Sequence, residues 1–255
     1  MKKRGKIKVK AVYFDVGHTL LRAQPSLYKY AAEVARRVSP EVTEQDFARV
    51  SHLMEKRFQL YLEDQAYHWS SRENILKLWE DVYGYWMELV GFKKKESRYL
   101  ARALYERLGK ADCWGVYPDV WETLEHLSRN GYYLGIISNW DERLELIIKQ
   151  TGLDNYFSFV LSSAQAGFGK PDSRLFELAA EKLRVEKQLT LFIGDDPKAD
   201  YYGALEAGMK ACLIDRENKY PDFKGLKIKN LSELKEVVPS VPSGSDLPAQ
   251  SERLK

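Results

Sequence analysis

The chain has 255 residues, of which 44% are hydrophobic and 30% charged, a composition typical of a soluble globular protein with room for a core and an inserted module. Its 40 basic and 37 acidic residues give a formal net charge of +3, so charge does not indicate a nucleic-acid partner. No apolar run reaches the length of a membrane span, and Cys113 and Cys212 form no metal-ligand pattern. We therefore expect a cytoplasmic protein, monomer or dimer, with no membrane partner.

The stretch 9–21 predicts the first strand of a buried sheet and the turn that follows it. Its apolar run leads to a single carboxylate, Asp15, and then to Gly17, which permits a tight turn, and Thr19. Open α/β sheets hold their chemical groups at this edge. Taken alone, the stretch leaves open that Asp15 only caps a turn.

From residue 25 to about residue 111 the apolar residues recur at steps of three and four, which predicts amphipathic helices. The clearest series are Tyr28-Ala31-Ala32-Ala35, Phe47-Val50-Met54, Ile75-Leu78-Trp79-Val82 and Leu100-Leu104-Leu108. We find no good strand candidate here, and we assign the aromatic side chains to packing. The stretch is interpreted as a helical bundle inserted after the first strand.

After Pro118 the pattern alternates between strands and helices. We predict strands at 132–137, 157–161, 189–193 and 210–214, separated by helices at 120–129, 142–151, 174–183 and 199–207. This alternation indicates βαβ units and a parallel sheet with right-handed crossovers. From residue 239 the chain turns to Pro, Ser, Gly and charge, and we expect 239–255 to be a disordered tail.

Polar side chains follow four of the predicted strands. They are Asp15 and Thr19, Ser138 and Asn139, Lys170, and the acidic set Asp195, Asp196 and Asp200. Gathered at one sheet edge, they can run covalent phosphoryl transfer: Asp15 attacks phosphorus, while Lys170 and Ser138 hold the phosphoryl oxygens. Asp15 and Asp195 can begin an oxygen-ligand site for Mg²⁺, the cofactor that would offset the negative charge.

The chain resembles the haloacid dehalogenase (HAD) superfamily over residues 9–215. The matching motifs are Asp15-Val-Gly-His-Thr19, Ser138-Asn139, Gly169-Lys170-Pro171-Asp172 and Gly194-Asp195-Asp196 with Asp200. The resemblance implies an α/β fold with a Rossmann-like parallel sheet of strand order 3-2-1-4-5 and an inserted all-helical cap of the C1 type. We assign 1–23 and 112–238 to the core and 24–111 to the cap. The implied metal ligands are Asp15, the carbonyl of Gly17 and Asp195, with Asp196 or Asp200 in support.

One position departs from the family pattern. The phosphatases of the family use Asp-x-Asp-x-Thr, in which the second Asp protonates the leaving alcohol and later activates water, and here that position is Gly17. General acid–base catalysis typically contributes ~10²–10⁴-fold. His18 is adjacent and titrates near neutrality, but a role in the turn is the stronger interpretation. We assign His18 and Asn139 to substrate contact.

We expect the chain to be a Mg²⁺-dependent phosphatase that acts on a small-molecule phosphate ester through an aspartyl-phosphate. A 2-haloacid dehalogenase is the first alternative, although that branch usually has Tyr where this chain has Phe176. A phosphonate hydrolase would need a Schiff-base lysine in the cap, and neither Lys77 nor the lysines at 93–95 can be assigned to that role. The third interpretation is a catalytically impaired HAD fold that serves as a binding protein.

Overall fold

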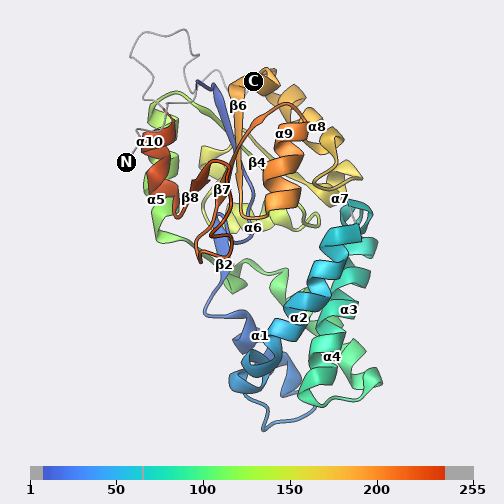
Figure 1. Ribbon diagram of the computed structural model, residues 1–255. Helices are drawn as coiled ribbons and strands as arrows, with labels where there is room; N and C mark the ends of the chain where they lie inside the picture. Colours follow the sequence, from blue (N-terminus) through green and yellow to red (C-terminus); the bar gives the residue numbers. More distant parts are fainter. Residues whose placement is uncertain (1–7, 65, 239–255) are drawn as a thin grey trace.

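The computed structural model describes residues 8–64 and 66–238, and its centre is a six-stranded parallel sheet (Figure 1). The strands lie in the spatial order β5-β4-β1-β6-β7-β8. Their bounds are β1 Ala11–Phe14, β4 Tyr133–Ser138, β5 Phe159–Ser162, β6 Thr190–Gly194, β7 Lys210–Ile214 and β8 Lys227–Ile228. The first five of these reproduce the predicted order 3-2-1-4-5. The edge strand β8 was not predicted, because two residues are too few to show a periodic pattern.

Helices cover both faces of the sheet, which explains why its central strand is apolar throughout. Val12 and Phe14 of β1 pack on one side against α5 (Pro118–Arg129), α6 (Leu144–Gln150) and α10 (Leu234–Val237). Tyr13 packs on the other side, against α8 (Ser173–Leu183) and α9 (Gly203–Glu206). The short α7 (Ser163–Ala166) follows β5 directly. All four side chains of β1 are buried, as the sequence predicted.

Two of the predicted helices begin differently from the sequence pattern. The helix predicted at 142–151 starts only at Leu144, because Asp141 accepts hydrogen bonds from the backbone N–H and the guanidinium of Arg143. The helix predicted at 199–207 begins with a π-helical segment, Pro197–Tyr202, that continues into α9. Both differences lie directly after strand ends, where side chains compete for the backbone groups that a regular first turn would use.

Four helices form a helical module, which lies along the chain between the sheet strands β1 and β4. They are α1 (Leu27–Ala35), α2 (Glu44–Asp64), α3 (Arg72–Val90) and α4 (Lys94–Leu108). The module has a hydrophobic cluster of its own around Trp86, whose ring packs edge-to-face on Phe47 at a centroid distance of 4.9 Å. Within the described part of 27–108 no strand occurs, as predicted.

An antiparallel ribbon of two strands joins the helical module to the sheet. β2 (Leu21–Ala23) leads into the module and pairs with β3 (Trp114–Val116), which leads out of it. Neither strand was predicted from the sequence, because a strand of three residues is too short to show alternation. In Figure 1 the module lies below the sheet, joined to it through the ribbon.

In the described ranges, no helix is long and apolar enough to cross a membrane. The tail predicted at 239–255 lies outside the described residues.

Candidate active site

Three strand ends bring Asp15 and its neighbours to one edge of the sheet. Asp15 directly follows β1, and its backbone N–H donates to the carbonyl of Ile193 in β6 at 2.8 Å. Ser138 ends the adjacent strand β4, and its hydroxyl donates to Asp15 Oδ1 at 2.9 Å. The parallel register therefore brings the first and second motifs into direct contact.

Lys170 connects Asp15 to Asp200 through a buried ammonium group. Its Nζ lies 2.6 Å from Asp15 Oδ1 and 2.6 Å from Asp200 Oδ1, and its side chain is 2% exposed. Burial acts to lower the pKa of Lys170, but the two carboxylates outweigh it and hold that pKa above its usual range. The lysine therefore stays protonated at neutral pH and holds Asp15 in a single orientation.

Asn139 holds the backbone of Lys170. Its amide nitrogen donates to the carbonyl of Lys170 at 2.9 Å, and its amide oxygen accepts from the backbone N–H of Lys170 at 2.7 Å. Both ends of the amide are thus committed to one residue. These hydrogen bonds hold the backbone of Lys170, and the substrate contact predicted for Asn139 from the sequence stays a prediction.

Asp15, Asp195 and Asp200 form a cluster of three carboxylates whose ligand oxygens all lie within 4.8 Å of one another. Burial and the negative charge of Asp15 raise the pKa of Asp195. Burial also raises the pKa of Asp200, to about 7, although Lys170 acts in the opposite direction. With all three ionised and Lys170 protonated, the set carries two net negative charges. Such a set of hard oxygen donors fits a divalent cation such as Mg²⁺.

Asp196 lies beside this cluster but is used as a helix cap. Its Oδ1 accepts hydrogen bonds from the backbone N–H groups of Lys198 and Ala199, each at 2.7 Å. The supporting metal role that the sequence left open between Asp196 and Asp200 is therefore better suited to Asp200. The capping interaction satisfies N–H groups at the start of the π-helical segment.

The turn from Gly17 to Thr19 differs from the expected one in its backbone. A glycine was expected to provide the tight turn, yet the left-handed residue is His18, with φ 54°. Gly17 lies outside that region, and a Cβ built on it would lie 3.9 Å from Cζ3 of Trp140, an ordinary contact. Thr19 is fully buried, and its hydroxyl has no hydrogen-bond partner within the described residues.

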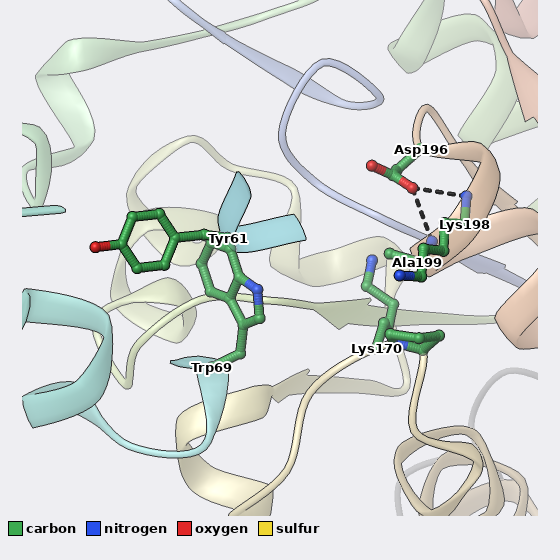
Figure 2. A pocket seen from close by; sticks show the side chains of 7 residues that line it. Tyr61, Trp69, Lys170, Asp196, Lys198 and Ala199 are labelled. Carbon is green, nitrogen blue, oxygen red and sulfur yellow. Dashed lines mark hydrogen bonds between the residues drawn. The ribbon is translucent and has the colours of Figure 1, made fainter. Parts of the chain in front are cut away.

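Two clefts open next to the carboxylate cluster. Figure 2 shows the first, in which Tyr61 and Trp69 of the module region lie across a gap from Lys170, Asp196 and Lys198 of the sheet edge. His18 is exposed and lines the second cleft together with Asp195, Arg216 and Lys219. The packing role predicted for the aromatic residues is confirmed for Trp69, which is buried in the hydrophobic cluster of the module with Tyr61 packed against it. That both residues also line a cleft was not predicted. No periodic signal distinguishes a cleft aromatic from a core aromatic.

A family model described as haloacid dehalogenase-like hydrolase matches residues 9–208. The chain belongs to this family. The haloacid dehalogenase-like hydrolase domain-containing protein 3 of Xenopus laevis is 31% identical over 211 residues, which are 81% of this chain and 84% of that protein. The matched range contains the positions of all four motifs described above.

Two solved structures with this fold belong to proteins named for different activities. A HAD phosphatase from Thermococcus onnurineus is 28% identical with a TM-score of 0.59, covering 89% of this chain and 96% of that one. A 2-haloacid dehalogenase from Pseudomonas syringae pv. Tomato DC3000 is also 28% identical, with a TM-score of 0.58, covering 89% of this chain and 97% of that one. Similarity alone therefore does not choose the reaction of this HAD-like hydrolase, and the chemistry of the site has to decide.

Proposed function

We propose that this HAD-like hydrolase is a Mg²⁺-dependent phosphatase that cleaves a small phosphate monoester through an aspartyl-phosphate on Asp15. The observation that carries the proposal is the gathering of Asp15, Asp195 and Asp200, whose ligand oxygens lie within 4.8 Å of one another, around the single ammonium of Lys170. Full ionisation of the three carboxylates leaves two negative charges that Lys170 does not compensate. Two uncompensated negative charges are costly in a buried site unless a cation or a proton balances them. In a phosphatase of this kind, that cation would also offset the charge of the phosphoryl group.

Asp15 is arranged to act as the nucleophile. Ser138 and Lys170 both donate to its Oδ1, which fixes the carboxylate and leaves Oδ2 without a hydrogen bond from either of them. An oxygen of Asp15 would form the new bond to phosphorus as the ester P–O bond breaks, and the leaving oxygen would depart with the bonding electron pair and take its proton from water, because Gly17 supplies no acid. Water would then hydrolyse the acyl phosphate and restore the carboxylate. Lys170 and Ser138 would also donate hydrogen bonds to the phosphoryl oxygens during the transfer.

Asp15, Asp195 and the carbonyl of Gly17 would hold Mg²⁺, with Asp200 in support. When bound, the ion supplies charge compensation for the phosphoryl group. The rest of the environment is fixed by the protein: Asp200 is held by Lys170 and by the backbone N–H of Asp196, which donates to its Oδ2 at 2.9 Å. These contacts orient the cluster before a ligand arrives.

We further propose that the helical module, residues 24–111, is the cap of the enzyme. The first cleft supports this, because Tyr61 and Trp69 come from the module region and line the cleft together with the lysine that contacts Asp15. The alcohol part of the substrate would lie between these aromatic rings and the sheet edge. The cap would then exclude water from the aspartyl-phosphate.

The carboxylate cluster weighs against the dehalogenase alternative. Two further carboxylates beside the nucleophile, those of Asp195 and Asp200, would repel the carboxylate of a 2-haloacid. Phe176, where that branch usually has Tyr, is fully buried and packs edge-to-face on Phe192 at 5.2 Å. A phosphonate hydrolase would need a Schiff-base lysine from the module. The lysines that line the first cleft are Lys170 and Lys198, and neither belongs to the module. Lys77 of the module pairs with Glu73 at 2.7 Å.

A panel of phosphate monoesters and 2-haloacids, assayed with and without Mg²⁺, tests the proposed function. We expect Mg²⁺-dependent phosphate release from at least one monoester and no halide release. Asp15→Asn should abolish turnover and keep the fold, because an amide is a poor nucleophile. Halide release without Mg²⁺ would instead establish the dehalogenase. Ligand binding without any turnover would establish the binding protein.

A further inference from the structure

Arg216 connects three segments that meet beside the active-site turn. It follows β7, and its Nε and Nη2 donate to the carbonyls of His18 at 3.1 Å and of Thr19 at 2.7 Å. Its Nη1 donates to Asp119 Oδ2 at 3.0 Å. One guanidinium therefore binds two successive carbonyls of the turn and one carboxylate of α5.

The surroundings of Arg216 fix it in place. Asp119 also accepts the backbone N–H of Leu231 at 2.6 Å, and the ring centroid of Tyr117 lies 3.8 Å from the guanidinium carbon. The side chains of Arg216 and Asp119 are 13% and 14% exposed. A planar guanidinium that donates to three acceptors and stacks on a ring holds its partners more rigidly than a flexible ammonium could.

The turn needs such an anchor. His18 has a left-handed backbone although it is not glycine, a conformation that persists only where neighbouring contacts hold it. Inside the turn, Val16 O accepts the N–H groups of Leu20 and Leu21, each at 2.9 Å, while the carbonyls of His18 and Thr19 are bound by Arg216. Tyr117 N–H also donates to Leu20 O at 3.0 Å, which joins the turn to the end of the ribbon.

We propose that Arg216 is a positioning residue for the reaction. It binds the two carbonyls that directly follow the Gly17–His18 peptide group, those of His18 and Thr19, and through them keeps the carbonyl of Gly17 aligned with Asp15 and Asp195. The inference rests on the proposed function for its consequence, because that carbonyl matters chemically only if the site holds a cation. Its structural content, the anchoring of the turn, is independent of the activity.

Arg216→Lys tests this role, and Arg107→Lys is its matched control. Arg107 pairs with Asp112 at 2.7 Å, lies 4.7 Å from the Tyr30 ring centroid and is 17% exposed, but it belongs to the helical module. For both variants we would measure Mn²⁺ binding by electron paramagnetic resonance, kcat and KM on an aryl phosphate, and the thermal midpoint without metal. Asp119→Asn, which removes the anchoring charge, serves if Arg216→Lys does not fold.

We expect Arg216→Lys to bind Mn²⁺ more weakly and to lose kcat, each by ~10-fold or more, with KM changed little. Arg107→Lys should lose thermal stability to a similar degree but keep its Mn²⁺ affinity and kcat. Equal Mn²⁺ affinity and kcat in Arg216→Lys and the native protein would overturn the inference.

A native protein that binds no Mn²⁺ and turns over no ester would overturn the proposed function instead. Amide hydrogen exchange at residues 17–21 then decides on Arg216 alone. Faster exchange there in Arg216→Lys, but not in Arg107→Lys, would support the anchoring role. Unchanged exchange would refute it.

Discussion

Gly194 and Asp200 approach each other so closely that a Cβ on Gly194 would lie 2.2 Å from Asp200 Oδ2. That oxygen accepts the backbone N–H of Asp196, and the other oxygen of the same carboxylate binds Lys170 at 2.6 Å. The carboxylate cannot move aside without losing one of these contacts. The glycine of the fourth motif is therefore required for space.

Gly194→Ala should accordingly displace Asp200 and loosen Lys170. We expect a loss of about 1–3 kcal/mol in the free energy of unfolding, the usual result of overpacking a buried site, measured by urea denaturation. Gly84→Ala is the control. Gly84 lies in the interior of α3, and a Cβ built on it would lie 4.0 Å from the Cβ of Ala101. That change should be neutral or stabilising. A Gly194→Ala variant as stable as Gly84→Ala would contradict the close approach.

The raised pKa values of Asp195 and Asp200 predict how stability depends on pH. A carboxyl group whose pKa is higher in the folded state binds more protons there than in the unfolded chain. Its contribution to stability is therefore present at low pH and is lost as the pH rises from about 4, the unfolded value, through about 7 for Asp200. Under the proposed function Mg²⁺ would bind the ionised cluster, so we expect the Mg²⁺-induced rise in thermal midpoint to be small at pH 5 and larger at pH 7.5.

Asp195→Asn is the control for this pH dependence. The amide keeps the shape of the side chain but removes one negative charge, which lowers the repulsion within the cluster. The metal-free variant should lose less stability between pH 5 and pH 7.5 than the native protein, and it should respond little to Mg²⁺. A native protein whose thermal midpoint rises equally with Mg²⁺ at both pH values would show that these carboxylates do not hold the ion.

The contact between α4 and the segment after Asn139 predicts how the helical module is held. The Tyr105 hydroxyl donates to Asp141, which is 1% exposed, and Arg143 donates to Glu106 at 3.2 Å. Tyr105→Phe removes a donor from a buried carboxylate and should loosen this docking contact. We expect solution scattering to give a larger radius of gyration for Tyr105→Phe than for the native protein, and a phosphate analogue to reduce the difference. Identical profiles for both proteins in both conditions would argue against a moving module.

The sequence predicted the sheet because its five long strands are apolar runs, four of which are followed by a polar motif. Strand order followed from the resemblance carried by Asp15, Ser138, Lys170 and Asp195. The ribbon strands β2 and β3 and the edge strand β8 were missed, since two or three residues carry no measurable period. Their pairing is decided by tertiary contacts.

The site was predicted less completely than the fold, for a physical reason. Sequence can indicate that Asn139 and Asp196 lie at a strand end, but not that the first binds the backbone of Lys170 and the second caps a helix. Arg216 was missed altogether, since it follows the last long strand with no recognisable motif around it. Residues that act through hydrogen bonds to distant backbone atoms leave no local pattern in the chain.

The last prediction concerns Gly17, where the phosphatases of the family have their acid–base Asp. A phosphatase without this group should depend strongly on its leaving group, because an aryl oxide leaves without a proton and an alkoxide does not. We expect measurable cleavage of p-nitrophenyl phosphate and slow cleavage of sugar phosphates. Gly17→Asp should raise the rate on alkyl esters more than on aryl esters, by up to ~10²-fold.

The backbone permits this experiment, because the left-handed residue of the turn is His18 and a Cβ at Gly17 meets only Trp140, at 3.9 Å. Gly17→Asn is the matched control, nearly identical in shape but unable to donate an acidic proton. If the new carboxyl group supplies the missing proton, the Asp variant alone gains activity on alkyl esters, and the gain falls away above the pKa of that carboxyl group. Equal rates for the Asp and Asn variants on alkyl esters would mean that another group, such as His18 or a residue of the helical module, already supplies the proton.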